Sequence, residues 1–174
     1  MPVRFQHEQL DNCIYFITYT CIKWKWLFEL SGAYDAVYKW FDSLYKNNVR
    51  VNGYVIMPNH VHALLYFPEM LKSLNTVIGN GKRFIAYRII RNLEQKKEIQ
   101  LLEEQYGFVK KAERKKGQQH KVFKDSFDAE QCYTREFLMQ KLDYIHKNPV
   151  SKRWQLVDDY TEYKYSSAGF YEKG

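Results

Sequence analysis

The sequence predicts a single domain that combines strands and helices. Three short stretches, residues 13–21, 50–57 and 60–67, are rich in the β-branched and aromatic residues that favour strands. Two longer stretches, 31–47 and 135–147, repeat apolar residues at the spacing of a helix that is buried along one side. With 174 residues, 45% of them hydrophobic, the chain is long enough for one domain with its own core.

The first two predicted elements are a strand and a helix. The stretch from Cys13 to Cys21 is short and dense in β-branched and aromatic residues, so we expect a buried strand. Ser31 can cap the helix that follows, because a serine oxygen accepts a bond from the free N–H groups of a first turn. We expect that helix to end at about Asn47.

The next two strands, 50–57 and 60–67, are joined by Pro58 and Asn59. This dipeptide forms either a tight turn or a bulge. Because proline cannot donate a hydrogen bond to a central ladder, a hairpin or a bent strand is favoured.

From Glu69 to about Gln95 the apolar spacing becomes helical, and the glycines at 79–81 predict a break or kink there. Residues 96–121 are polar and charged. They form either a solvated helix and loop or an arm that contacts phosphates.

The last predicted helix runs from Arg135 to about Lys147, with Thr134 as its cap. Pro149 ends it, because the residue before a proline is disfavoured in the helical conformation. The aromatic residues beyond 153 predict a tail that packs on the sheet.

His60 and His62 are the first candidate functional residues. Side chains alternate along a strand, so both imidazoles point to one face while Val61 and Ala63 point to the core. Two neighbouring imidazoles are half of a metal site, although such pairs also occur among ordinary surface histidines.

Tyr144 and Asn148 complete the candidate site. They are four residues apart on one helix and therefore share a face. Two imidazoles and the Asn148 oxygen suit Mg²⁺ or Mn²⁺ and leave positions open for a phosphate. The Tyr144 hydroxyl would be the nucleophile; its ordinary pKa is near 10, so it needs the metal or a base nearby. Packing is the alternative role for one of 15 tyrosines.

Charge points towards nucleic acid. The chain carries 27 Lys and Arg against 20 Asp and Glu, a formal net charge of +7, which favours a polyanionic partner but is also compatible with a basic enzyme. Aromatic residues, 17% of the chain, either stack on bases or fill the core. The residues expected to follow DNA phosphates are Lys82, Arg83, Arg88, Arg91, Lys110, Lys111, Arg114, Lys115, Lys116 and Lys121.

Three cysteines without a Cys-x-x-Cys spacing argue against a disulfide framework and against a cysteine zinc site. The N-terminus lacks the apolar segment of a signal peptide, and no run is long enough to span a bilayer. We therefore expect a soluble cytoplasmic protein that has no membrane partner and associates with the nucleoid.

Two motifs together resemble a known family. The stretch from Gly53 to Leu65, which contains Pro-Asn-His-Val-His, and the stretch from Leu142 to Val150, which contains Tyr-Ile-His-Lys-Asn-Pro, are similar to those of the single-tyrosine HUH transposases. The likeness is greatest to their REP-associated tyrosine transposase branch, in which a serine-containing segment like Tyr165 to Ala168 follows.

The resemblance implies a role for each candidate. The histidine pair that holds the divalent ion corresponds to His60 and His62, the nucleophile to Tyr144, and the polar residue that can join the metal to Asn148. Members cut single-stranded DNA beside a hairpin, form a 5′-phosphotyrosine and leave a free 3′-hydroxyl that can reverse the step.

The resemblance also implies an α+β fold of the ferredoxin-like HUH endonuclease type, with a central antiparallel sheet and helices packed on one side of it. Residues 1–174 are expected to form a single such domain, which can lack part of a C-terminal tail. The expected partner is single-stranded DNA with hairpins, bound by a monomer or a homodimer.

Three functions stay open on the sequence. The first is a metal-dependent single-stranded DNA endonuclease and strand transferase. The second is a catalytically silent, domesticated protein that binds DNA hairpins without nicking them; only the first forms a covalent protein–DNA product. The third, a phosphoesterase like the histidine-triad enzymes, is less favoured because Leu64 stands where a third alternating histidine would be needed.

Overall fold

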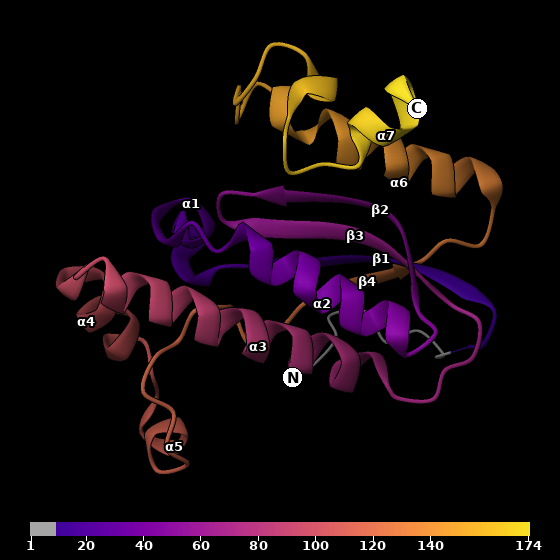
Figure 1. Ribbon diagram of the computed structural model, residues 1–174. Helices are drawn as coiled ribbons and strands as arrows, with labels where there is room; N and C mark the ends of the chain where they lie inside the picture. Colours follow the sequence, from indigo (N-terminus) through magenta and orange to yellow (C-terminus); the bar gives the residue numbers. More distant parts are fainter. Residues whose placement is uncertain (1–9) are drawn as a thin grey trace.

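A four-stranded antiparallel sheet with the strand order β2-β3-β1-β4 forms the centre of the molecule (Figure 1). The computed structural model describes residues 10–174; the N-terminal stretch without a signal-peptide pattern lies outside this range. The strands are β1 (Cys13–Thr20), β2 (Arg50–Met57), β3 (His60–Phe67) and β4 (Asp128–Gln131). The three predicted strands are confirmed, whereas β4 was not predicted, since it contains no β-branched or aromatic residue.

The helices cover both faces of the sheet (Figure 1). They are α1 (Leu27–Ser31), α2 (Tyr34–Lys46), α3 (Leu74–Gln95), α4 (Ile99–Gly107), α5 (Lys111–Arg114), α6 (Arg135–Lys147) and α7 (Ala168–Lys173), with 3₁₀ turns η1 (Ile22–Trp24), η2 (Asn148–Val150) and η3 (Tyr160–Glu162). The expected α+β architecture is confirmed, but the expectation that the helices pack on one side of the sheet is wrong. α2 and α3 lie on one face, and α6 packs against β2 and β3 on the other.

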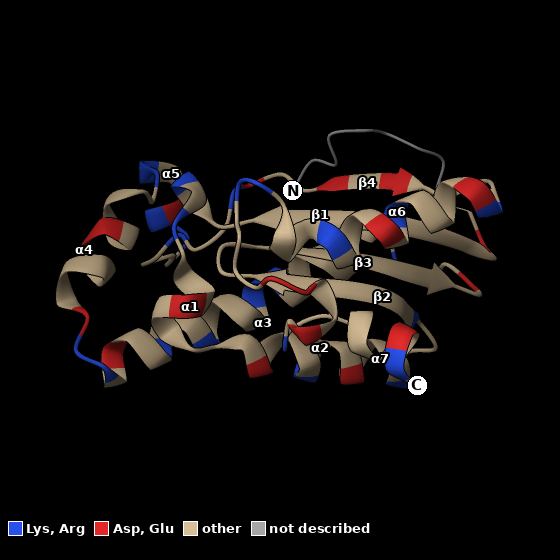
Figure 2. Cartoon of the chain, turned by 90° about the horizontal axis from the view of Figure 1, so that it is seen from above, with Lys and Arg blue, Asp and Glu red and all other residues tan. Residues whose placement is uncertain are grey.

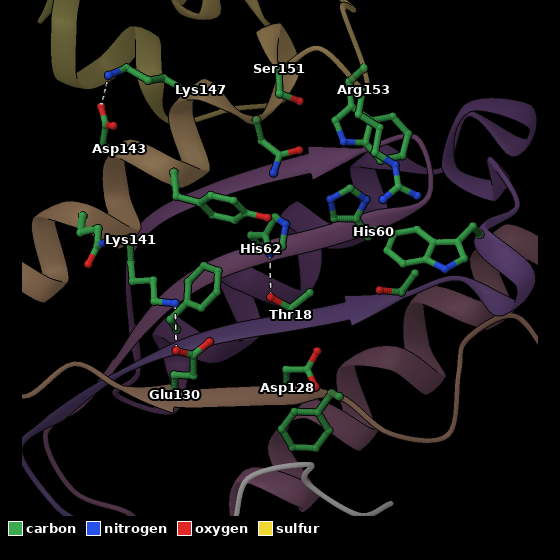
Figure 3. Close-up of a pocket in the computed structure, with 18 of the residues that line it drawn as sticks. Thr18, His60, His62, Asp128, Glu130, Lys141, Asp143, Lys147, Ser151 and Arg153 are labelled. Carbon is green, nitrogen blue, oxygen red and sulfur yellow. Dashed lines mark hydrogen bonds and ion pairs between the residues drawn. The ribbon is translucent and has the colours of Figure 1, made fainter.

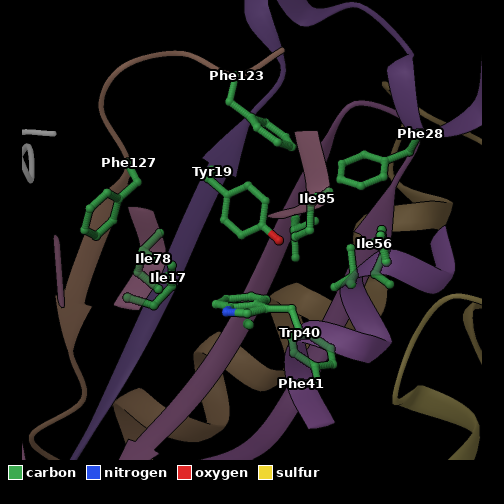
Figure 4. Close-up of a cluster of buried hydrophobic side chains, with 14 of the residues drawn as sticks. Ile17, Tyr19, Phe28, Trp40, Phe41, Ile56, Ile78, Ile85, Phe123 and Phe127 are labelled. Carbon is green, nitrogen blue, oxygen red and sulfur yellow. The ribbon is translucent and has the colours of Figure 1, made fainter. Parts of the chain in front are cut away.

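The larger core lies between the sheet and the helices α2 and α3. Alternate residues of β1 and β3 point into it, among them Tyr19 and Val61, and Figure 4 shows Tyr19 and Trp40 at its centre. These two rings meet edge to face with centroids 5.9 Å apart. Burial of these apolar side chains is the main force that holds α2 and α3 against the sheet.

The opposite face carries a smaller apolar cluster under α6. Phe16, Val55 and Leu64 point up from the strands. Leu142 and Ile145 of α6 cover them. Beyond this cluster the same face continues into polar residues of β1 and β3, so α6 packs next to a polar part of the sheet.

Pro58 and Asn59 form a two-residue turn, because Met57 pairs directly with His60. The predicted hairpin is confirmed. Residues outside the hairpin bind the backbone of this turn. The Cys21 N–H donates to the Asn59 carbonyl at 2.8 Å, and the Phe28 N–H donates to the Pro58 carbonyl at 3.0 Å.

The helix boundaries differ from the prediction at Ser31. This serine ends α1, and α2 begins at Tyr34 without a side-chain cap. The Ser31 hydroxyl donates to the Leu27 carbonyl at 2.5 Å and accepts from the Ala33 N–H at 3.2 Å, so it stabilises the link between the two helices. The end of α2 at Asn47 is confirmed.

The predicted break at 79–81 is wrong, because α3 is continuous through both glycines. Gly81 faces the Trp40 indole, where a Cβ atom would overlap the ring. This glycine therefore allows two helices to approach closely rather than interrupting one of them.

The limits of α6 match the prediction. The Thr134 hydroxyl accepts from the Phe137 N–H at 3.1 Å, and the helix ends at Lys147, two residues before Pro149.

The predicted aromatic tail returns to the outer edge of the sheet. The Ile56 N–H donates to the Tyr165 carbonyl at 2.8 Å, and the Ser167 N–H donates to the Tyr54 carbonyl at 3.0 Å. The Ser167 hydroxyl also lies 2.9 Å from Nε2 of the buried His146 of α6. The tail thus covers the edge of β2 and attaches to α6.

None of the helices in the described part of the chain combines the length and the hydrophobicity that crossing a membrane requires.

Gly79 and Gly81 offer a matched test of packing within one helix. A methyl group at position 79 meets nothing within 4 Å, so Gly79→Ala should raise the free energy of unfolding by about 0.5–1 kcal/mol through helix propensity. Gly81→Ala would push a methyl into Trp40 and should lower it by about 1–3 kcal/mol. Urea unfolding followed by circular dichroism measures both, and stabilisation by both variants would contradict the close approach.

Candidate active site

His60 and His62 lie on the face of β3 that α6 partly covers. Their Cα partners across the sheet are Thr20 and Thr18 of β1. The two imidazoles are 4% and 5% exposed, with ring centroids 4.7 Å apart. The predicted common orientation is confirmed, and both rings are buried rather than solvated.

Thr18 orients the His62 ring. Its hydroxyl oxygen lies 2.7 Å from His62 Nδ1, and the Phe16 ring stacks on the imidazole with centroids 5.4 Å apart. Within residues 10–174, the buried Nε2 atom of His62 has no hydrogen-bond partner. A hydrogen bond from Nδ1–H to Thr18 would leave the lone pair on Nε2.

Asn59 determines which nitrogen of His60 carries the proton. The Asn59 amide nitrogen donates to the Trp24 carbonyl at 2.9 Å, so its oxygen is the atom that lies 2.6 Å from His60 Nδ1. An amide oxygen can only accept, and therefore Nδ1 is protonated. The lone pair of His60 is then on Nε2, as in His62.

Tyr144 and Asn148 reach the same groove from α6 and from the turn η2 that follows it. The Tyr144 side chain is 51% exposed, with its ring centroid 5.2 Å from that of His62. Asn148 is buried, and its Oδ1 atom has no hydrogen-bond partner among the described residues. The four residues predicted for the site line one groove of about 870 Å³. Figure 3 shows this groove with His60 and His62 labelled.

Both imidazoles are neutral at pH 7. Burial lowers the pKa of His60 to about 3; the Arg153 guanidinium adds to this shift and Asn148 opposes it. Burial also holds the pKa of His62 well below its ordinary value, and His60 and Lys141 contribute further. Neutral imidazoles have the free lone pair that a metal ion requires.

The donor atoms fit a divalent ion with an incomplete protein shell. No group of three or more His, Cys, Asp or Glu side chains suited to a metal occurs in residues 10–174. His60 and His62 instead offer two imidazole nitrogens, and Asn148 offers an amide oxygen. Two of the three atoms, His62 Nε2 and Asn148 Oδ1, are buried without a partner in this part of the chain, a costly state that a bound cation would relieve.

Four cations that the sequence analysis did not select line this groove: Lys124, Lys141, Lys147 and Arg153. In Figure 3 Arg153 lies beside His60, Lys141 extends from α6 towards the strands, and Lys147 lies farther from the imidazoles with its side chain turned away from them. Lys141 pairs with Glu130 at 2.9 Å, and Lys147 pairs with Asp143 at 2.7 Å. Helical spacing was the available signal for two of them, because Lys141 and Lys147 stand three residues before and after Tyr144.

None of the ten basic residues predicted to follow DNA lines this groove. Those of α5 lie at the far end of the molecule from α6 (Figure 2). Arg83, Arg91 and Lys116 line a second groove of about 830 Å³ beside α3. Seven of the ten are exposed: Arg83, Arg91, Lys110, Lys111, Arg114, Lys115 and Lys116.

Three of the predicted basic residues have partners within the protein. Two of them, Lys82 and Lys121, are buried, which argues against direct contact with DNA, whereas Arg88 is partly exposed and its role towards DNA stays a prediction. Lys82 is 2% exposed and donates to the carbonyls of Lys124, Asp125 and Ser126. The buried Lys121 pairs with Glu113 and with Asp125, both at 2.7 Å, and Arg88 pairs with Asp35 at 2.6 Å.

Lys82 remains charged despite its burial. Burial lowers its pKa to about 8, and Asp125 opposes the shift. The ammonium therefore keeps its proton at pH 7 and donates to the carbonyls of residues 124–126. It attaches that loop, which also lines the groove, to α3.

Lys82→Met should lower the free energy of unfolding by about 1–3 kcal/mol, because three partly buried carbonyl groups lose their charged donor. The matched control is Arg83→Met at the exposed neighbouring position, which should change it by less than about 0.5 kcal/mol. Chemical denaturation measures both. Unchanged stability of Lys82→Met combined with weaker DNA binding would return Lys82 to the DNA-contacting residues.

Comparison with solved structures identifies a fold relative. The structure of a REP-associated tyrosine transposase bound to a REP hairpin aligns with a TM-score of 0.65 and 14% sequence identity, over 97% of this chain and 84% of that one. No protein-family model and no curated protein matches the sequence. At this identity the likeness shows the fold: a single α+β domain built on a four-stranded antiparallel sheet.

Proposed function

We propose that this protein is a metal-dependent nuclease and strand transferase of the single-tyrosine HUH type, acting on single-stranded DNA beside hairpins. The observation that carries the proposal is the geometry of one groove. An exposed tyrosine, Tyr144, stands beside two buried neutral imidazoles. Two atoms that could bind a metal, His62 Nε2 and Asn148 Oδ1, have no hydrogen-bond partner among the described residues.

Each of the four residues would have one role. Tyr144 is the nucleophile, and His60, His62 and Asn148 would hold Mg²⁺ or Mn²⁺. Such an ion would supply positive charge to a phosphate bound in the groove and to the charge that develops on its oxygens during the reaction.

In the cleavage step, the Tyr144 oxygen attacks the phosphorus and forms a 5′-phosphotyrosine bond. The bond between phosphorus and the 3′-oxygen breaks, and that oxygen leaves with the bonding electron pair. The proton that the phenol loses is balanced by the proton that the 3′-oxygen gains. Attack by a 3′-hydroxyl on the phosphotyrosine is the reverse reaction and would join strands.

Lys141 and Lys147 would hold the DNA backbone on either side of Tyr144. Each now pairs with an acidic side chain, Glu130 or Asp143, at the rim of the groove. Partly exposed ion pairs are weak, so either lysine can exchange a carboxylate for a phosphate at small cost.

The fold relative supports the substrate class, because that transposase is bound to a hairpin. We propose a DNA hairpin as the partner of this chain as well, bound by a monomer or a homodimer, with the protein in the cytoplasm at the nucleoid.

Tyr144→Phe should abolish formation of the covalent DNA adduct while leaving folding and most DNA binding unchanged. The assay incubates labelled single-stranded hairpin oligonucleotides with protein and Mn²⁺ or Mg²⁺, followed by a denaturing gel. Tyr45→Phe is the matched control, since Tyr45 is 66% exposed on α2 and lines neither groove.

An adduct that persists in Tyr144→Phe would refute the nucleophile. Hairpin binding by the wild-type protein with no adduct in either metal would favour the silent hairpin binder instead.

Thr18→Val should weaken Mn²⁺ binding about 10- to 100-fold, because the His62 ring loses the hydroxyl that orients it. Titration with Mn²⁺ followed by electron paramagnetic resonance measures the free ion directly, without DNA. Thr20→Val is the control: it lies on the same face of β1, and its side chain makes no hydrogen bond to either imidazole within residues 10–174. Equal affinities for the wild type and Thr18→Val would argue against His62 as a ligand.

A further inference from the structure

We propose that Trp24 is a stacking platform for an unpaired base of single-stranded DNA, located directly beside His60. This inference rests on the proposed function for its choice of DNA as ligand. It adds a binding subsite for a base to the groove that contains Tyr144.

Trp24 and Trp154 flank the His60 ring. The ring centroids of Trp24 and His60 are 6.0 Å apart, and those of Trp154 and His60 are 5.3 Å apart. Both indoles line the groove that contains Tyr144. Trp24 is 41% exposed, so packing in the core does not account for it.

Cations lie over these rings. Lys124 Nζ is 4.4 Å from the centroid of Trp24, and the Arg153 guanidinium carbon is 4.6 Å from the same centroid. Arg153 also lies 5.1 Å from the Trp154 centroid. Rings between cations are the arrangement by which proteins bind single strands: the rings stack on bases and the cations contact phosphates.

The backbone holds Trp24 in an unfavourable conformation. Lys23 and Trp24 have φ values of 52° and 58°, in the left-handed region that side chains other than glycine rarely adopt. Asn59 secures this conformation, because its amide donates to the Trp24 carbonyl while its oxygen accepts from His60. The position of the indole is therefore coupled to that of His60, and conformations of this kind concentrate at functional sites.

A base can compete with the cations for the ring. Stacking of one base on an aromatic side chain is worth about 5- to 150-fold in affinity. A cation over an exposed ring is worth only about 2- to 5-fold. The displaced lysine or arginine stays in the groove, where it can pair with the phosphate next to the stacked base.

The ligand would be an unpaired nucleotide. Bases inside a duplex already stack on their neighbours and offer no open face to an indole. The platform therefore suits the single-stranded stretch beside a hairpin, and the nucleotide on Trp24 would adjoin the phosphate that reaches His60.

The test measures binding without cleavage, in the Tyr144→Phe protein and without divalent ions. The two probes are dT12 and a 12-mer of abasic residues, which carry the same backbone charge. We expect dT12 to bind more tightly, and Trp24→Ala to weaken dT12 binding about 5- to 150-fold while leaving the abasic strand unchanged.

Two further variants control for folding and for ring type. Trp26→Ala removes an indole of similar exposure, 44%, that does not line the groove, and it should keep the preference for dT12. Trp24→Tyr retains a stacking ring and should keep most of the preference for dT12 over the abasic strand. Thermal unfolding verifies that each variant is folded.

Equal affinity of the parent protein for both strands would overturn the proposal, as would a Trp24→Ala variant that keeps the preference or weakens both strands equally. The result is separate from the nuclease proposal. A base preference that depends on Trp24 supports the subsite even if no covalent adduct forms. If an adduct forms but the preference is absent, the nuclease proposal remains and only the Trp24 subsite is refuted.

Discussion

Alternation of side chains along β3 is the constraint on which the rest of the structure depends. This strand lies between β2 and β1, and both of its faces are covered. Val61 and Ala63 belong to the large core with α2 and α3, while His60 and His62 point into the groove under α6. A shift of one residue in the register would exchange the two sets, putting imidazoles into an apolar core. The register of β3 that fills the core is therefore also the register that directs the two histidines into the groove.

The groove is built on this strand by segments that are distant in the sequence. The loop of residues 124–126 is attached to α3 by hydrogen bonds from Lys82 to its carbonyl groups. The Pro58–Asn59 turn is attached to η1 by the hydrogen bond from the Asn59 amide to the Trp24 carbonyl. Both attachments place a charged or polar side chain on backbone carbonyl groups. Such bonds are strong when buried and leave an unsatisfied group when broken, so they fix loops that apolar contacts alone would leave adaptable.

The predictable part of the molecule follows from local periodicity. The two-residue period of a strand predicted that His60 and His62 point to one face. The helical period predicted that Tyr144 and Asn148 reach one site, which they do from α6 and from the turn η2. The unpredicted part depends on contacts between distant residues. β4 has a weakly strand-forming sequence and exists because it pairs with β1. Helical spacing places Lys82 on the buried stripe of α3, four residues after Ile78, but the carbonyls that accept from its ammonium lie 42 to 44 residues further along and no local pattern indicates them. The chemical roles of the four site residues stay predictions.

The bond between His146 and Ser167 makes α6 dependent on a segment about 20 residues beyond it. Ser167 is also bonded to the backbone of Tyr54, and so it joins the helix that carries Tyr144 to the edge strand of the sheet. Neither side chain of this linkage lines the groove, yet together they connect the helix that carries the tyrosine to the sheet. In a genetic selection for loss of function, changes at Ser167 would consequently be grouped with changes at Tyr144. Only a measurement of folding or of helix position would separate the residue that aligns the site from the residue that reacts.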